Sequence, residues 1–185
     1  MRELAAAGLL LAFGASACGA PAELPVYAEI EQVRLMTSLG GELTAESLSG
    51  KVHVVDFIFT SCGAACPTMT AKMKRLYEEF EVEPEVRFLS VSSDPDRDTV
   101  DVLHEYAAEL RVDESRWLFA RAEMGEVKRL SEKEFLLAAA GFPIGHSQRF
   151  VLVDRERRIR GYYDSADLAD LERLATDLSR LVEAG

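Results

Sequence analysis

Basic residues, cysteines and repeated segments are scarce in this sequence. Its 21 Lys and Arg stand against 32 Asp and Glu, which gives a formal net charge of −11. Phosphate binding needs clustered cations, so this balance argues against a nucleic-acid partner. The chain has no internal repeat or low-complexity tract, and 48% of its 185 residues are hydrophobic. These properties fit one globular domain with a sizeable core, and not a disordered or fibrous chain.

The first 17 residues have the pattern of a signal peptide. Arg2 carries a positive charge, residues 4–13 are apolar, and Ala15-Ser16-Ala17 forms a small-residue cleavage pattern before Cys18. An apolar stretch of this length is too short to span a bilayer. We therefore predict that residues 1–17 are removed and that the mature protein works outside the cytoplasm.

Cleavage after Ala17 would leave Cys18 as the new N-terminus. This arrangement resembles a bacterial lipoprotein signal, although Ala15 stands where such signals usually have leucine. We predict lipidation of Cys18, a short tether over residues 18–27, and a folded domain over residues 28–185. The protein would then be anchored to a membrane by lipid, in the periplasm or on the outer face of the cell membrane. The alternative is a plainly secreted protein with an odd thiol.

Two of the three cysteines remain for the folded domain, in the segment Cys62-Gly63-Ala64-Ala65-Cys66-Pro67. At this spacing both sulfurs lie on one face of the first turn of a helix. The pair can close a disulfide, or it can present two soft thiolates to one metal ion. A disulfide across so small a loop contributes little loop entropy to stability. The role of this dithiol is therefore predicted to be chemical.

Strands and helices alternate along the chain, which predicts an α/β fold. A nearly all-apolar run over residues 52–60 is typical of a central strand, and the cysteines follow it directly. Further strands are expected at 33–36, 42–44, 86–91, 117–120, 150–153 and 159–163, and helices after the cysteines and at 99–110, 124–135 and 168–181. We expect Asp98 to cap the second helix. A dithiol at a strand-to-helix junction predicts a thioredoxin-like fold: a mixed sheet flanked by helices, with an added N-terminal hairpin and a final hairpin at the sheet edge.

Three motifs then appear in a fixed order. They are Phe57-Ile58-Phe59-Thr60-Ser61-Cys62 with Cys66-Pro67, Ser93-Asp94-Pro95-Asp96-Arg97-Asp98-Thr99, and His146-Ser147 before Phe150-Val151-Leu152-Val153-Asp154. In these motifs the chain resembles the Sco/SenC family, from about Ile30 to the C-terminus. The resemblance implies a thioredoxin-like domain that binds one copper ion through two cysteines and a histidine. By motif match the ligands would be Cys62, Cys66 and His146.

The resemblance also implies a role in maturing the dinuclear copper centre of cytochrome c oxidase. The implied partners are the copper-site subunit of that oxidase and an upstream copper donor or thiol reductant. The chemistry agrees with this, because Cu(I) prefers thiolates while Cu(II) accepts a mixed sulfur and imidazole set. A helix N-terminus also lowers cysteine pKa values, which favours the deprotonated ligands that metal binding requires.

Position separates the three histidines. His53 lies within the apolar strand and is expected to be a core residue, whereas His104 lies in a charged helix and is expected to face solvent. His146 lies in a glycine-flanked loop that enters a strand. In thioredoxin-like folds the corresponding loop carries a cis-proline beside the dithiol. His146 stands where that proline would be, three residues after Pro143.

Two carboxylates and two methionines complete the candidates. Asp56, six residues before Cys62, either accepts protons during thiol exchange with a pKa raised by burial, or pairs with a nearby Lys or hydroxyl. Asp94 either supports the metal site from an outer shell or simply opens a turn before proline. Met69 and Met73 recur at helical spacing in an apolar stripe, so we expect them in the core and not as thioether ligands.

Three functions compete at this point. The first is a copper metallochaperone, and the second is a thiol–disulfide oxidoreductase without a stable metal, for which the dithiol alone suffices. His146 favours the first, because a pure reductase needs no imidazole there. Three residues between the cysteines also depart from the usual thioredoxin motif. A peroxidase is disfavoured, since Phe59 stands where such sites place a threonine.

Overall fold

The computed structural model describes residues 23–61 and 65–184, and for residues 65 and 66 it describes the backbone alone. The described strands form one mixed sheet in the order β1-β8-β7-β4-β5-β6-β2-β3. The strands are β1 (Ala28–Glu29), β2 (Arg34–Thr37), β3 (Glu42–Thr44), β4 (Val52–Ile58), β5 (Val86–Ser92), β6 (Trp117–Arg121), β7 (Arg149–Val153) and β8 (Arg158–Asp164). The helices are α1 (Ala65–Glu79), α2 (Val100–Leu110), α3 (Met124–Arg129) and α4 (Leu168–Glu183), with a 3-10 turn η1 (Glu46–Leu48) and a π-helical turn η2 (Leu130–Glu134).

β4 lies at the centre of the sheet. All of its seven residues are buried, as the apolar run predicts for a strand covered on both faces. It pairs in parallel with β5 and antiparallel with β7, and β5 pairs in parallel with β6. The carboxyl ends of β4 and β5 therefore meet at one edge of the sheet. The predicted central strand is confirmed, although it ends at Ile58 and not at Thr60.

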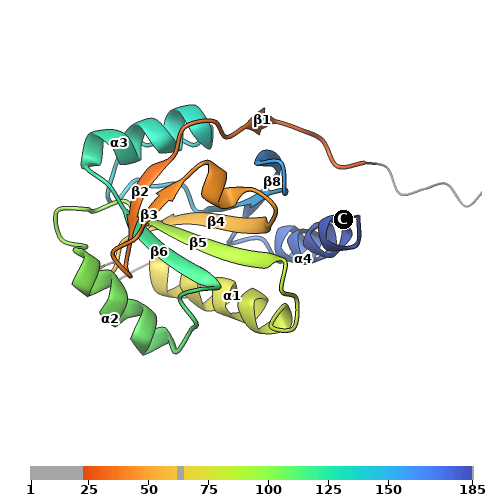
Figure 1. The fold of residues 1–185 in the computed structure, drawn as a ribbon, viewed down its shortest axis with the longest axis horizontal. Coiled ribbons are helices and arrows are strands. Elements are labelled where there is room, and N and C mark those ends of the chain that lie inside the picture. Colours follow the sequence, from red (N-terminus) through yellow and green to blue (C-terminus); the bar gives the residue numbers. More distant parts are fainter. Residues whose placement is uncertain (1–22, 62–64, 185) are drawn as a thin grey trace, which may run out of the picture.

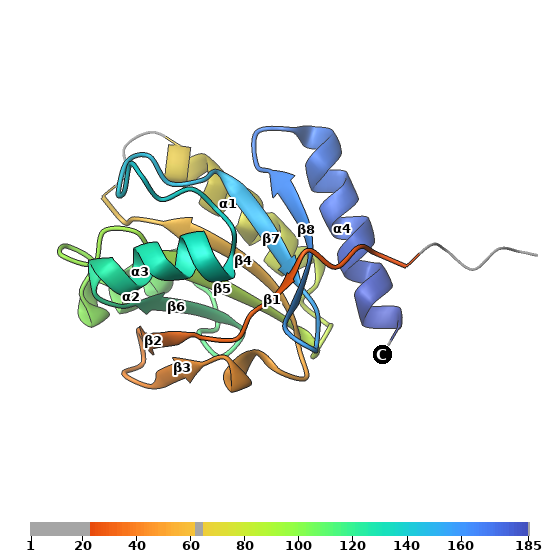
Figure 2. The same ribbon diagram turned by 90° about the horizontal axis from the view of Figure 1, so that it is seen from above.

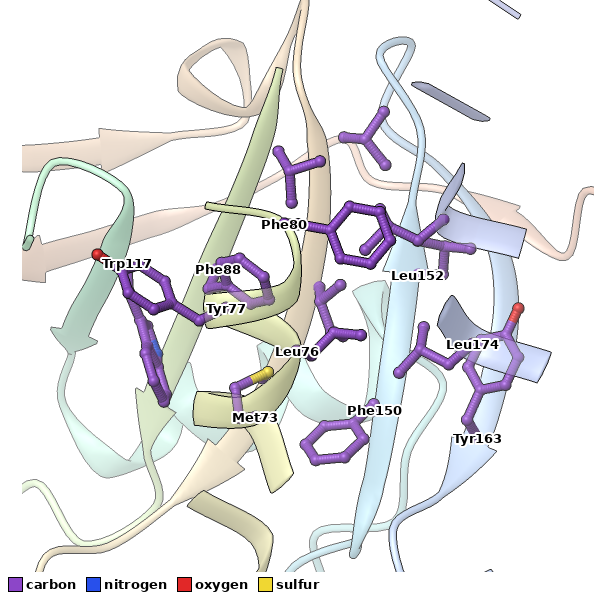
Figure 3. Packing of buried hydrophobic residues seen from close by; sticks show 14 of the residues in the cluster. Met73, Leu76, Tyr77, Phe80, Phe88, Trp117, Phe150, Leu152, Tyr163 and Leu174 are labelled. Atoms are coloured by element: carbon purple, nitrogen blue, oxygen red, sulfur yellow. The ribbon is translucent and has the colours of Figure 1, made fainter. Parts of the chain in front are cut away.

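Helices cover both faces of the sheet, with α3 on one side and α1 and α2 on the other (Figure 1). On the second side, α4 shares a core cluster with α1 and α2. Figure 3 shows the side chains of α1 in this cluster, where Met73 and Leu76 pack toward Phe150 and Leu152 of β7. Met69 and Met73 are both buried, which confirms that they belong to the core.

The predicted hairpin near the N-terminus is confirmed as β2 and β3, and β2 joins the sheet through β6. The prediction that the final hairpin lies at the sheet edge is wrong. β7 lies beside β4, and β1 pairs with the outer side of β8. The cause is the segment before the first hairpin, which contributes a two-residue strand and buries Ile30 against the second core cluster.

The predicted cap of the second helix is wrong, and the third helix changes type along its length. Thr99 caps α2, since its side chain accepts a hydrogen bond from the backbone N–H of Val102, and Asp98 binds elsewhere. The helix predicted over 124–135 is present, as α3 up to Arg129 and then as a wider π-helical turn before Phe135. Within that turn, the Glu134 carboxylate accepts hydrogen bonds from backbone N–H groups of residues 31 and 32. Helical periodicity alone does not reveal such a long-range contact.

Residues 23–27 form neither helix nor strand, but they are held against the domain. Arg160 on β8 donates hydrogen bonds to the carbonyl oxygens of Leu24, at 2.5 Å, and Pro25, at 3.0 Å. The same guanidinium pairs with Asp154 at 2.7 Å, and both side chains are 4% exposed. In the described part of the chain, no helix is both long and apolar enough to cross a membrane.

Candidate metal centre

The candidate site lies where the chain leaves the carboxyl end of β4. Cys18 and Cys62 fall outside the described residues, and Cys66 is described only as the second backbone position of α1. Among the described side chains, no group of three His, Cys, Asp or Glu residues comes together in a way that could hold a metal. The described residues nearest to the dithiol in the chain are those at the carboxyl end of β4, and the contacts of His146 with them bear on the predicted ligand set.

His146 lies against Phe59, the third residue before Cys62. The two rings meet edge to face, with centroids 5.7 Å apart and an interplanar angle of 89°. Phe59 is 9% exposed and His146 is 7% exposed, so this contact is largely closed to solvent. In Figure 2 the loop between η2 and β7 lies at the same end of the molecule as the beginning of α1. The fold thus brings the late histidine to the end of β4 that leads to the cysteines.

The surroundings of His146 favour the neutral imidazole that a metal ligand needs. Burial lowers the pKa of His146, and the hydrogen bond to the Ser147 carbonyl opposes this shift only in part. Nδ1 lies 3.1 Å from that carbonyl oxygen. A carbonyl only accepts, so Nδ1 carries the proton and Nε2 of the neutral ring carries the lone pair. This arrangement fits an imidazole that coordinates through Nε2.

The loop that carries His146 is fixed at several points. Gly141 and Gly145 form an isolated bridge across its base, and a Cβ added to either would lie within 2.7 Å of the other's backbone. Phe142 packs on Phe57 of β4 with ring centroids 6.0 Å apart. The Phe142–Pro143 peptide bond is cis, so a cis-proline is present three residues before His146.

Ser93 links the loop to the sheet. Its hydroxyl lies 3.0 Å from the Ile58 carbonyl oxygen at the end of β4 and 3.4 Å from the Pro143 carbonyl oxygen. Its backbone N–H also donates to the Ile58 carbonyl. The ends of β4 and β5 and the histidine loop are therefore connected through one buried serine.

Asp98 holds the segment between β4 and the cysteines. Its carboxylate accepts hydrogen bonds from the Thr60 hydroxyl at 2.6 Å and the Ser92 hydroxyl at 2.5 Å. The backbone N–H of Thr60 lies 3.3 Å from both carboxylate oxygens. Asp98 is fully buried, and these contacts explain why it does not cap α2. They fix the chain two residues before Cys62.

Asp94 and Asp56 lie near this site in different ways. Asp94 is buried in the turn after β5, where its Oδ2 pairs with Nη1 of Arg97 at 2.7 Å. Asp56 is fully buried within β4, on the face that Val54 and Ile58 share beneath α1. Neither carboxylate oxygen of Asp56 has a hydrogen-bond partner in the described part of the protein.

Burial raises the pKa of Asp56 to about 7. A weak interaction with the nearby Ser90 hydroxyl opposes the rise in pKa, and that hydroxyl accepts a hydrogen bond from Nε1 of Trp117 at 2.9 Å. Of the two interpretations for Asp56, pairing with a nearby Lys or hydroxyl is therefore not observed among the described residues. A buried, unpaired carboxyl that titrates near neutral pH can exchange a proton with its surroundings.

The other two histidines behave as expected. His53 is 1% exposed, and burial lowers its pKa to about 4. His104 is exposed on α2, with Nδ1 2.7 Å from Glu114. Neither lies at the carboxyl end of β4.

Sequence reasoning missed the polar residues that shape the site, namely Thr60, Ser92, Ser93 and the buried role of Asp98. A signal for them was present, because hydroxyl residues directly follow two apolar strands. Carboxyl ends of neighbouring parallel strands meet at one edge, so hydroxyls at these positions are expected to lie together.

Comparison with known proteins agrees with this geometry. The sequence model of the SCO1/SenC family matches residues 23–183. The chain is 29% identical over 179 residues to the SCO1 protein homolog of Bacillus subtilis (strain 168), covering 93% of this chain and 92% of the relative. It is 27% identical over 147 residues to a putative copper-binding protein of Stutzerimonas stutzeri, covering 75% and 71% of the two chains.

Solved structures give the same result. One solved structure is that of BsSco, described as a member of the Sco family of cytochrome c oxidase assembly proteins with a disulfide switch. It superposes on this protein with a TM-score of 0.77 and 27% sequence identity, and the match covers 88% of this chain and 98% of BsSco. A SCO1/SenC family lipoprotein from Bacillus anthracis str. Ames superposes with a TM-score of 0.75 at 28% identity over 83% and 94%. The chain therefore belongs to the SCO1/SenC family and has its thioredoxin-like fold.

Proposed function

We propose that this protein is a copper metallochaperone. It binds one copper ion through Cys62, Cys66 and His146. It then delivers the copper to the dinuclear copper site of cytochrome c oxidase, or it reduces a disulfide between the cysteines of that site to thiols, while Cys62 and Cys66 become a disulfide, so that copper can enter. The observation that carries the proposal is the buried contact between His146 and Phe59, because it supports a neutral imidazole beside the dithiol.

The donor set suits copper as a cargo that arrives and leaves. Two thiolates hold soft Cu(I), and an added imidazole allows Cu(II) to bind at the same place. The position of Cys66 in the first turn of α1 favours its thiolate, since a helix N-terminus stabilises negative charge. Asp94, buried near these residues and paired with Arg97, would support the neighbouring loop from an outer shell without binding copper itself.

The relatives supply the partners in this proposal. The Stutzerimonas stutzeri relative is named as a putative copper-binding protein, and BsSco is described within a family of cytochrome c oxidase assembly proteins. By analogy, the partners of this protein would be the copper-site subunit of the oxidase and an upstream copper donor or thiol reductant. The Bacillus anthracis relative is described as a lipoprotein, which supports lipidation of Cys18 and a location outside the cytoplasm.

The test is an anaerobic copper titration of the reduced domain. We expect about one copper per chain and, for Cu(II), a sulfur-to-copper charge-transfer band. Loss of that band without loss of protein fold in the Cys66→Ser variant would support the ligand set. A wild-type protein that binds no copper under these conditions would contradict the proposal.

A second function is a thiol–disulfide oxidoreductase that reduces a client. It is favoured by Asp56, whose unpaired carboxyl has a pKa of about 7 and can take up a proton as thiols exchange. A disulfide switch has also been identified in the related BsSco. The oxidoreductase would reduce a client disulfide equally well with and without copper, and Asp56→Asn would slow the exchange without changing copper stoichiometry. If Asp56→Asn leaves the exchange rate unchanged between pH 6 and pH 8, Asp56 has no part in proton transfer.

A further inference from the structure

We propose that Ile144 is a docking residue for the partner protein that exchanges copper with this site. It lies at the tip of the loop over residues 141–145, two residues before His146. The inference rests on the proposed function and adds to it the surface through which the partner is recognised. The partner must present an apolar pocket beside its own copper ligands.

The first observation is exposure. Ile144 is 84% exposed, although it belongs to a loop whose neighbouring residues are anchored in the molecule. Phe142 packs on Phe57, and the Pro143 carbonyl lies 3.4 Å from the Ser93 hydroxyl. An apolar side chain held out in solvent on a fixed loop gains stability only when another surface covers it. Because the loop is already ordered, covering it costs little conformational entropy.

The second observation is position. Direct transfer of copper between proteins requires ligands of the partner to reach bonding distance of the metal, on the order of 2 Å. A partner that comes so close to a metal held by His146 must also cover the residues beside it. Ile144 would then be buried in the complex, near the centre of the contact, where apolar anchors contribute most to binding.

The third observation is charge. Residues 135–149 contain no Asp or Glu, and neither do residues 57–77, although the chain has 32 acidic residues. The nearby turn after β5 exposes Asp96 beside Arg97, so its exposed charges nearly cancel. An apolar partner surface can therefore approach Ile144 without desolvating a carboxylate, which would oppose docking.

A membrane is disfavoured as the occupant. Arg160 on β8 holds Leu24 and Pro25 near the β1 end of the sheet, so the segment leading to Cys18 starts there. In Figure 2 residues 23–27, which precede β1, lie on the side of the molecule opposite the loop between η2 and β7. Because these residues are held away from the loop, we expect a lipid anchor upstream of them to leave the loop open to a protein partner.

The experiment compares copper transfer from three copper-loaded proteins: wild type, Ile144→Asp and Val82→Asp. Val82 is a matched control, because it is 82% exposed and lies in the turn between α1 and β5, at the other end of β4. The acceptors are the reduced, copper-free copper-centre domain of the oxidase subunit and the small chelator bathocuproine disulfonate. For Ile144→Asp we expect about a tenfold slower transfer to the protein and unchanged transfer to the chelator. Val82→Asp should transfer at the wild-type rate to both.

Several results would overturn the inference. Ile144→Asp transferring to the protein at the wild-type rate would show that Ile144 is not covered in the complex. If Val82→Asp slows copper transfer to the protein equally, the cause is the added negative charge and not the loss of an apolar contact at residue 144. Slower transfer to the chelator would mean that Ile144 acts on the copper site itself, and a changed oligomeric state alone would assign the loop to a second copy. Wild-type protein that loads copper but transfers none to the oxidase domain contradicts the inference while leaving copper binding intact, whereas failure to load copper contradicts the proposed function first.

Discussion

The two ends of β4 are stabilised by different kinds of interaction. At its amino end, near Val52, charged side chains pair at the surface: Lys51 with Glu85 at 2.8 Å, and Arg155 with Glu85 at 3.8 Å. At its carboxyl end, near Ile58, the polar contacts are buried and involve Asp98 and Ser93.

The surface ion pairs at the amino end of β4 bear on stability alone, whereas the buried hydrogen bonds at the carboxyl end also bear on the candidate metal site. Exposed ion pairs contribute little and tolerate change, because solvent screens them. Buried hydrogen-bond networks fix geometry, and breaking one leaves an unsatisfied group in the interior. The rigid contacts lie at the end of β4 that leads to the dithiol, where a copper site would need its ligands held in place. Four predictions test the contrast.

The largest effect is expected at the cysteines. Cys62→Ser or Cys66→Ser should reduce copper retention below detection and abolish disulfide exchange, because each removes a soft ligand and one half of the dithiol. Cys18→Ser, measured on the chain over residues 18–185 without its lipid, is the control and should retain wild-type copper affinity. A Cys66→Ser variant that still reduces a client disulfide would exclude Cys66 from the exchange mechanism.

The second effect concerns two buried groups on β4. The pKa of Asp56 is raised from 3.8 to about 7, so the unfolded chain ionises first and the folded state loses stability as the pH rises from about 4 to 7. Asp56→Asn should therefore increase the free energy of unfolding by roughly 2 to 4 kcal/mol at pH 8, with a much smaller change at pH 4. Denaturant titrations at both pH values measure this.

His53, near the amino end of β4, provides the opposite case. Its pKa is lowered from 6.5 to about 4, so the folded state loses stability as the pH falls from about 6.5 to 4. His53→Gln should weaken the dependence of stability on pH in that acidic range only. Identical pH profiles for the Asp56 and His53 variants would contradict the assigned shifts.

The third effect tests the buried network. Asp98→Ala leaves the Thr60 and Ser92 hydroxyls without their acceptor and should lower the free energy of unfolding by about 2 kcal/mol. Copper affinity should fall as well, because Thr60 is two residues from Cys62. Asp101→Ala, an exposed change in the first turn of α2, is the control. Unchanged copper affinity in a folded Asp98→Ala protein would separate the network from the site.

The smallest effect is expected at the amino end. Glu85→Ala removes both surface ion pairs and should change the free energy of unfolding by less than about 1 kcal/mol, with no effect on copper affinity. Denaturation with added salt tests whether the ion pairs cause this change, since salt screens them in the wild type and should reduce the difference between the two proteins. A loss as large as that of Asp98→Ala would remove the contrast between the two ends.

The sequence predicts the central elements well where the local pattern determines them. β4 follows from an uninterrupted apolar run, and the burial of Met69 and Met73 follows from helical spacing. The prediction from sequence fails where contacts with residues distant in the chain determine the local structure. Asp98 and Thr99 both suit the cap of α2, and only the positions of Thr60 and Ser92 explain why Asp98 turns inward. The hydrogen bond from Arg160 to Leu24 likewise joins residues far apart in the chain.

The candidate site shows the same division. Spacing identifies the dithiol, and a family motif selects His146 among three histidines. The contact of His146 with Phe59, its protonated Nδ1 and the exposure of Ile144 depend on how the loop folds against β4 and β5. No local pattern encodes these features.

The most direct measurement is an anaerobic copper titration of wild type beside His146→Ala, with His104→Ala as the surface control. If the imidazole completes the site, His146→Ala should weaken Cu(II) binding by at least about a hundredfold and Cu(I) binding far less, since thiolates alone satisfy Cu(I). His104→Ala should bind both as the wild type does. Cu(II) affinity unchanged in His146→Ala would contradict the account.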